Sequence, residues 1–172
     1  MIIETERLIL RQFTIDDLKA LAPILADREV MRFSLNGPYS REKTEQFIRR
    51  CLDNYLKRGT GLLALIHKGD DKLIGYCGIV IQEIDGEELP EVGYRLDPSY
   101  WGRGLATEAA AAAADYGFYN LGFPCLISII EEENTASIRV AEKNGFVYGK
   151  DAVFMGQVPV RIYSKRLKEP AR

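Results

Sequence analysis

The chain is poor in the residues that build metal sites and hydrolase triads. Its 172 residues include one histidine, His67, and three cysteines, Cys51, Cys77 and Cys125, without a C-x-x-C pair. A zinc site or a Ser-His-Asp system would depend on His67 alone, so we expect neither and predict no metal. The odd number, wide spacing and apolar surroundings of the cysteines predict core thiols in a reducing compartment.

The chain also lacks an excess of positive charge and any long hydrophobic run. Lys and Arg total 23 against 25 Asp and Glu, which is not the basic balance of a generic nucleic-acid binder. The apolar stretch from Ala109 to Ala114 is far shorter than the ~20 residues that a membrane-spanning helix needs. The opening MIIETERLIL does not resemble a signal peptide. We therefore expect a cytoplasmic protein with neither a nucleic acid nor a membrane as partner.

What the sequence does contain is a mixture of helical and strand periodicities, without repeats or a long linker. Helical spacing predicts one helix carrying Leu18 to Leu25 and others near 40–59, 103–120 and 134–143. Strand patterns cover 7–13, 62–67, 73–84, 91–96, 125–130, 146–148 and 158–167. Polar turns predict an antiparallel meander over 62–96, and the strand-helix-strand unit over 91–130 predicts a parallel crossover. We expect one mixed α/β domain spanning residues 1–172.

A glycine-rich turn, Trp101-Gly102-Arg103-Gly104-Leu105-Ala106, joins a predicted strand to a predicted helix. Such a turn presents free backbone N-H groups and the positive end of the helix dipole, which together favour a phosphate group. A tight packing turn would explain the glycines equally well. The chain has no G-x-x-x-x-G-K-[ST] motif, and Thr107 stands where a dinucleotide fingerprint has Gly or Ala.

The segments EVGYRLDPSYWGRGLATEA and ENTASIRVAEKNGFV resemble the core of the GNAT N-acetyltransferases. ETERLILR and DREVMRF resemble the Rim-type branch, which acetylates the N-termini of ribosomal proteins. The resemblance covers nearly the whole chain. It implies a mostly antiparallel sheet with a splayed parallel strand pair, about four flanking helices, and acetyl-CoA as co-substrate. It also suggests a homodimer.

The resemblance implies a set of cofactor-binding positions. Backbone groups of residues 94–96 would bind the pantetheine arm and thioester, and backbone amides of the turn would bind the diphosphate. Trp101 replaces the polar first residue of the family pattern, at little cost because backbone amides do the binding. Asn134 is also expected as an N-cap, and Ser137 is equally well explained as a surface hydroxyl. The full set is Tyr94, Arg95, Leu96, Trp101, Gly102, Arg103, Gly104, Leu105, Ala106, Thr107, Asn134 and Ser137.

The catalytic groups are less clearly marked. Many family members carry a tyrosine as general acid on the last helix, but Ala141 stands at the corresponding place. Ser137 is therefore the candidate donor of a proton to the thiolate, and a backbone N-H near Leu96 is the candidate oxyanion donor. Glu91 is the candidate base, although a solvated charge at a strand end would look the same. For Glu108 we expect electrostatic support of the helix N-terminus rather than a role as base.

The resulting hypothesis is direct transfer of an acetyl group from acetyl-CoA to a primary amine in a ternary complex. The acceptor would be a protein N-terminus or a small-molecule amine such as a polyamine or an aminoglycoside. Arg32, Phe33, Tyr39 and Tyr100 are the residues expected to line its site. Two alternatives remain open: a non-catalytic module that binds or senses acyl-CoA, and a more distant dinucleotide-binding oxidoreductase.

Overall fold

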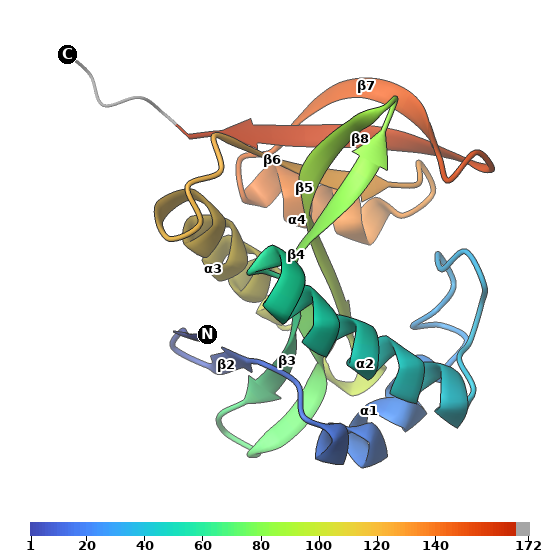
Figure 1. Cartoon of the computed structure of the whole chain (residues 1–172), viewed down its shortest axis with the longest axis vertical. Coiled ribbons are helices and arrows are strands. Elements are labelled where there is room, and N and C mark those ends of the chain that lie inside the picture. The colour runs from blue at the N-terminus through green and yellow to red at the C-terminus, as the bar shows by residue number, and fades with distance from the viewer. Residues whose placement is uncertain (168–172) are drawn as a thin grey trace.

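The computed structural model, which describes residues 1–167, contains the predicted elements in the predicted order, with one further strand at the start (Figure 1). The strands are β1 (Ile2–Glu4), β2 (Leu8–Arg11), β3 (Leu62–His67), β4 (Lys72–Ile84), β5 (Glu87–Leu96), β6 (Cys125–Ile130), β7 (Val147–Phe154) and β8 (Val158–Arg166). The α-helices of the described part are α1 (Leu18–Leu25), α2 (Arg41–Arg58), α3 (Leu105–Tyr119) and α4 (Thr135–Lys143). Short 3-10 turns, Ile15–Asp17 and Pro98–Tyr100, precede α1 and the glycine-rich turn.

All eight strands belong to one sheet with the order β1-β2-β3-β4-β5-β6-β8-β7. Every neighbouring pair is antiparallel except β5 and β6, which are parallel, as the strand-helix-strand pattern predicts. The pairing of β5 with β6 is confined to Glu91 and Ile127, so the two strands part beyond this point. The predicted mixed sheet with a splayed parallel pair is therefore confirmed.

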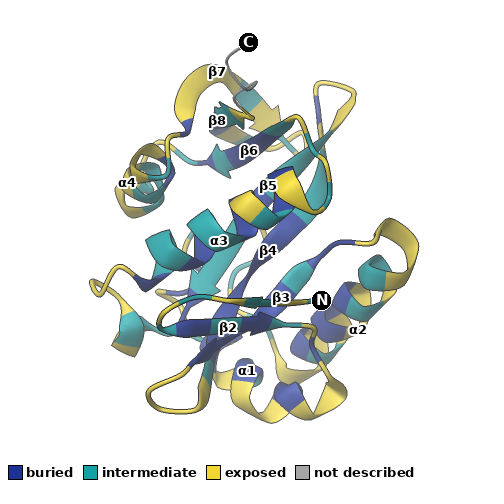
Figure 2. Ribbon diagram, turned by 90° about the vertical axis from the view of Figure 1, so that its left-hand side faces the viewer, coloured by how far each residue is buried: buried dark blue, intermediate teal, exposed yellow. Residues whose placement is uncertain are grey.

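Helices cover both faces of the sheet, with α3 on one side of β4 and α2 on the other (Figure 2). Ala109, Ala110, Ala113 and Ala114 of α3 are buried against the sheet. A Cβ on Gly117 would lie 2.5 Å from the Cδ1 atom of Ile79, which shows how closely this helix approaches β4. The small residues thus set the position of α3, and with it the position of the turn at its N-terminus.

The opposite face carries a second core beneath α1 and α2. Phe47 of α2 packs edge-on against Phe13 and lies over Tyr76 of β4 with ring centroids 5.0 Å apart. Cys51 and Cys77 are buried, as predicted for core thiols, and Cys125 is half-buried. The two helices leave the sheet surface between β4 and β5 open towards the fork.

Several boundaries differ from the sequence prediction. β1 is an additional strand, and its three residues are too few to show an alternating pattern. β7 extends to Phe154, beyond the predicted 146–148. It is an edge strand whose residues are mostly exposed, so its sequence lacks the apolar alternation by which a core strand is recognised. α3 begins at Leu105 rather than near Arg103, because Gly102 and Gly104 have φ angles of +70° and +75°, outside the helical region.

Candidate functional site

The fork between β5 and β6 exposes backbone donors of β5. The N-H of Asp97 donates to the carbonyl of Ile74 in β4 at 2.7 Å. Because alternate residues of a strand direct their N-H groups to opposite sides, the N-H groups of Tyr94 and Leu96 point away from β4, into the gap before β6. At the base of the fork, Ser128 Oγ donates to the carbonyl of Val92 at 3.5 Å.

The glycine-rich turn lies at the open end of the fork. Gly102 and Gly104 both have positive φ, and a Cβ on Gly102 would meet nothing within 4 Å. The first amides of α3, a helix of 15 residues, have no partner within the helix and point towards the turn. Trp101 Nε1 donates to the carbonyl of Leu96 at 2.8 Å, so this indole fixes the turn to the end of β5. The geometry is that of an anion cradle.

A cavity of about 510 Å³ connects the fork with this turn, and we call it the donor cavity. Arg32, Arg139 and Lys143 also border it, and such cations suit the phosphate groups of a nucleotide. These features fit the expected acetyl-CoA. The predicted cofactor residues that border the donor cavity are Tyr94, Arg95, Leu96, Trp101, Gly102, Gly104, Leu105, Ala106, Thr107, Asn134 and Ser137.

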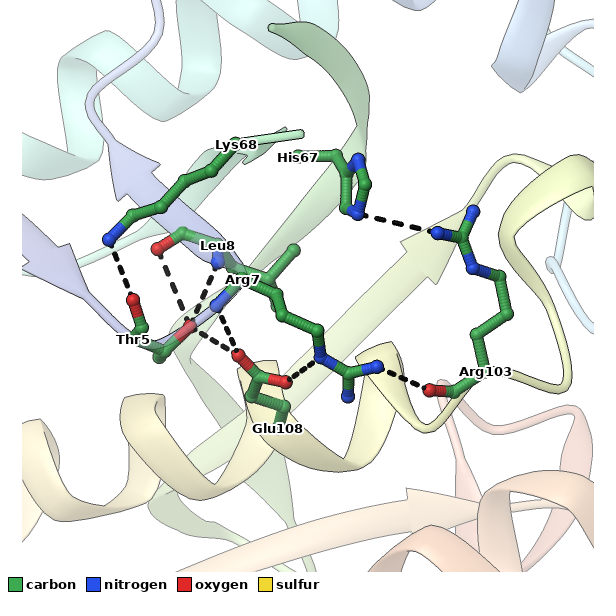
Figure 3. A network of polar contacts seen from close by, with 7 residues as sticks. All are labelled: Thr5, Arg7, Leu8, His67, Lys68, Arg103 and Glu108. Atoms are coloured by element: carbon green, nitrogen blue, oxygen red, sulfur yellow. Dashed lines mark hydrogen bonds and ion pairs between the residues drawn. The ribbon is translucent and has the colours of Figure 1, made fainter. Parts of the chain in front are cut away.

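Arg103 is the one predicted cofactor residue that does not border the donor cavity, because its side chain turns back towards the β3–β4 hairpin. Its guanidinium lies 5.1 Å from the centre of the Tyr100 ring, and Nη2 is 3.5 Å from His67 Nε2 (Figure 3). The Tyr100 hydroxyl in turn donates to Asp70 Oδ2 at 2.7 Å. Arg103 therefore braces the turn from outside, and only its backbone remains for the cofactor.

A second brace connects the turn to the β1–β2 connection (Figure 3). One oxygen of Glu108, in the first part of α3, accepts hydrogen bonds from Thr5 Oγ1 at 2.6 Å and from the N-H of Arg7 at 2.9 Å. Its other oxygen accepts from Arg7 Nε at 2.7 Å. Arg7 Nη1 donates to the carbonyl of Arg103 at 2.8 Å. We call the contacts among Thr5, Arg7, Arg103 and Glu108 the Arg7–Glu108 clamp.

The contacts of the clamp also change the pKa of Glu108. Burial acts to raise the pKa of this carboxyl, but the hydrogen bonds from Thr5 and Arg7 outweigh burial and leave the pKa below its usual value. Sequence reasoning assigned Glu108 only to the helix N-terminus and missed its partners. No spacing rule could have found them, since Arg7 and Glu108 are 101 residues apart.

A second cavity of about 340 Å³ lies over β4 and β5 on the side of the α1–α2 connection, and we call it the acceptor cavity. Phe33, Tyr94, Arg95, Asn134 and Ser137 border both cavities, so the two meet beside the fork. The guanidinium of Arg95 donates to the carbonyl of Val30 at 2.9 Å and thereby holds the α1–α2 connection over the sheet.

Two of the four residues expected at the acceptor site lie elsewhere. Phe33 and Tyr39 border the acceptor cavity, but Arg32 and Tyr100 border only the donor cavity. Tyr100 follows the end of β5 in the turn leading to Trp101, and its contact with Asp70 carries its ring away from the acceptor side. Arg32 and Tyr100 therefore do not border the acceptor cavity.

Glu91 lies within β5, opposite Val80 of β4, and its side chain borders the acceptor cavity. Burial raises its pKa to about 7, against the smaller opposing effect of the hydrogen bond from Gln82 Nε2 to Glu91 Oε2 at 2.9 Å. Because β5 begins at Glu87, Glu91 is not the solvated strand-end charge that the sequence also allowed. A carboxyl with this pKa can accept a proton near neutral pH.

Ser137 lies beside a tyrosine hydroxyl whose role the sequence did not reveal. Burial raises the pKa of Tyr94 to about 12, and a side-chain hydrogen bond with Ser137 acts in the opposite direction. The sequence indicated a role for the backbone of Tyr94 alone, because no local spacing connects this residue of β5 with Ser137 of α4. Asn134 itself N-caps α4, its Oδ1 accepting from the N-H of Ser137 at 3.2 Å. Ala141 is buried in the core, as its small side chain allows.

The described residues, 1–167, contain no helix that is long and apolar enough to cross a membrane. They also contain no group of three or more His, Cys, Asp or Glu side chains arranged to hold a metal ion.

Comparisons with known proteins identify acetyltransferases as similar in sequence and in fold. A family model described as an acetyltransferase (GNAT) domain matches residues 7–147. The uncharacterized protein YkkB of Bacillus subtilis is 33% identical, with 94% of each chain covered. Spermidine N(1)-acetyltransferase of Escherichia coli is 30% identical over 80% of this chain and 71% of its own. An acetyl transferase of Salmonella typhimurium, described as modifying the N-terminal serine of a 50S ribosomal subunit protein, superposes with a TM-score of 0.81 at 19% identity, covering 98% of this chain and 100% of its own.

Proposed function

Because this chain belongs to the GNAT acetyltransferase family, we propose that it transfers the acetyl group of acetyl-CoA to a primary amine by direct attack in a ternary complex. The observation that carries this proposal is the meeting of the two cavities beside the fork. One cavity ends at an anion cradle, and the other holds a carboxyl with a pKa near neutrality. An amine entering beside Glu91 would therefore meet an acyl donor lying along β5.

The donor side would bind through the backbone. Amides of Gly102 to Thr107 would hold the diphosphate, with the N-H groups of Tyr94 and Leu96 directed at the pantetheine arm and the thioester carbonyl. The thioester supplies an acyl carbon that an uncharged amine can attack without further activation. The Leu96 N-H is the donor we assign to the oxygen that gains charge during the attack.

Proton transfer would be divided between the two sides of the fork. Glu91 accepts the proton that the amine loses as its nitrogen forms the new bond to the acyl carbon, directly or through water. Ser137 donates a proton to the sulfur as the carbon–sulfur bond breaks, and Tyr94 can replace the proton on Ser137. Both residues border both cavities, which supports a role for them near the departing sulfur.

A thiol-release assay tests the proposal. Acetyl-CoA with a panel of amines and peptides should release coenzyme A, and coenzyme A alone should raise the melting temperature. A melting shift without thiol release for any amine would favour the alternative, a non-catalytic acyl-CoA module. NAD should cause no shift.

The proposal also includes the expected domain organisation and cellular compartment. The reduced cysteines and the continuous sheet support one catalytic domain that works in the cytoplasm. A homodimer stays a prediction, to be measured by sedimentation or light scattering.

A further inference from the structure

The charge of the acceptor cavity limits the amines that it suits. Glu91 and Glu131 are the carboxylates that border it, and the guanidinium of Arg95 borders the same cavity. The neighbouring acids are directed elsewhere: Glu132 pairs with Arg161, and Glu133 borders the donor cavity. With Glu91 half-protonated near pH 7, the cavity holds little net negative charge. An extended polycation would find no row of carboxylates along it.

Polar and apolar side chains share the walls of the acceptor cavity, and the apolar ones come from three parts of the chain. Phe33 and Leu35 come from the α1–α2 connection, Leu62 and Val80 from the sheet, and Phe154 and Val160 from the β7–β8 hairpin. Apolar side chains from three parts of the chain thus surround the region in front of Glu91. Such walls favour a ligand that carries apolar surface next to its amino group.

Gly93, which has no side chain, lies in the floor of the cavity between Glu91 and Arg95, on the same face of β5. A Cβ added there would meet only Leu62 Cδ2, at 3.6 Å, which is an ordinary contact. The φ angle of Gly93 is not positive, so another residue would cause no backbone strain. The space above Gly93 is therefore open to a ligand rather than filled by the protein.

We infer that the acceptor is a primary monoamine whose amino group lies next to an apolar or aromatic group, and that this group packs over Gly93. The inference rests on the proposed function. It distinguishes an amine with one charge and an apolar body from an extended polyamine. A free arylalkylamine and a peptide N-terminus with an apolar first residue share this chemistry.

The test compares thiol release with phenethylamine, ethylamine, spermidine and two short peptides, one beginning with Phe and one with Gly. The kcat/KM for phenethylamine or the Phe peptide should exceed that for spermidine by about tenfold or more. Faster turnover of the free amine identifies a small-molecule acceptor, and faster turnover of the Phe peptide identifies an N-terminus. Equal or faster turnover of spermidine overturns the inference but leaves the proposed function standing. Absence of thiol release with every amine overturns both.

Gly93→Ala probes the packing directly. The added methyl group should raise KM for phenethylamine about tenfold more than KM for ethylamine, while coenzyme A still raises the melting temperature as in the wild type. Gly149→Ala is the matched control, because Gly149 lies in strand β7 away from both cavities and an added Cβ would have its nearest contact at 3.4 Å. An equal change for both amines in Gly93→Ala would show that Gly93 does not contact the apolar group.

Discussion

The two ends of the site are built in different ways. The donor end is built mainly from backbone, with cationic side chains only at its border: two left-handed glycines, the amides of a helix terminus and the N-H groups of a splayed strand. The Arg7–Glu108 clamp braces it from behind. The acceptor end consists of side chains, contributed by a connection between helices, the face of the sheet and the β7–β8 hairpin. A backbone site requires only small residues at fixed spacing, whereas a side-chain site can change its ligand with each substitution.

The largest effect is expected at Glu91, the carboxyl in the acceptor cavity that we propose as the base. Glu91→Gln keeps the shape and the contact with Gln82 but removes the base, so kcat/KM should fall by about 100-fold with KM for acetyl-CoA unchanged. In the wild type, kcat/KM should decline as the pH falls through about 7, because Glu91 becomes protonated. The pH-rate profiles of both proteins measure this, and persistence of the acidic limb in Glu91→Gln would remove Glu91 from the mechanism.

The same carboxyl predicts a change in stability with pH. The folded-state pKa of Glu91, about 7, lies above its ordinary value of 4.5. The contribution of this carboxyl to the free energy of unfolding is therefore fully present below pH 4.5 and is lost as the pH rises through 7. Glu91→Gln avoids this loss and should be more stable than the wild type at pH 8 by about 2 kcal/mol. Melting curves at pH 5 and pH 8 provide the check, and a gain that is the same at both pH values would contradict the assigned pKa.

At the donor end, the largest effect should come from the Arg7–Glu108 clamp. Glu108→Ala removes three hydrogen bonds, including two from Arg7, and should lower the free energy of unfolding by about 2 kcal/mol. KM for acetyl-CoA should rise severalfold because the turn loses its support. Urea unfolding and donor titration measure the two effects.

Glu45→Ala provides the control for Glu108→Ala. Its exposed ion pair with Arg49 on α2 should contribute less than about 0.5 kcal/mol. An unchanged KM for acetyl-CoA in a folded Glu108→Ala protein would show that the clamp does not position the turn.

A smaller effect is expected where the two ends meet. Ser137→Ala should lower kcat about tenfold, and Tyr94→Phe should lower it less, if Tyr94 acts through Ser137. In that case the double variant Ser137→Ala/Tyr94→Phe should have the same kcat as Ser137→Ala alone, because both substitutions interrupt the same path of proton transfer to the sulfur. Steady-state kinetics over a range of pH tests this, and a kcat for Ser137→Ala equal to that of the wild type would exclude Ser137 as the acid.

The features that could be predicted from the sequence are those that depend on local pattern. The parallel crossover, the turn and the cap at Asn134 were predictable because each depends on local pattern: a strand-helix-strand unit, two glycines and an N-cap residue. The splaying of β5 and β6 was expected only from the family resemblance. The clamp was not predictable, since it joins residues of the β1–β2 connection to a glutamate of α3 about a hundred positions away. The environment of Glu91 was also hidden, because it depends on Gln82 of the neighbouring strand β4. Periodicity shows which face of an element is apolar, but not which side chains of other elements complete a cavity.

The outer brace at Arg103 should have the smallest effect. Tyr100→Phe keeps the ring beneath the Arg103 guanidinium and removes only the hydrogen bond to the exposed carboxylate of Asp70. Because this contact is exposed to solvent, KM for acetyl-CoA should rise by no more than about twofold. Tyr100→Ala removes the ring as well and should have a larger effect on KM. If both variants raised KM equally, the hydrogen bond to Asp70, rather than the stacking on Arg103, would hold this side of the turn.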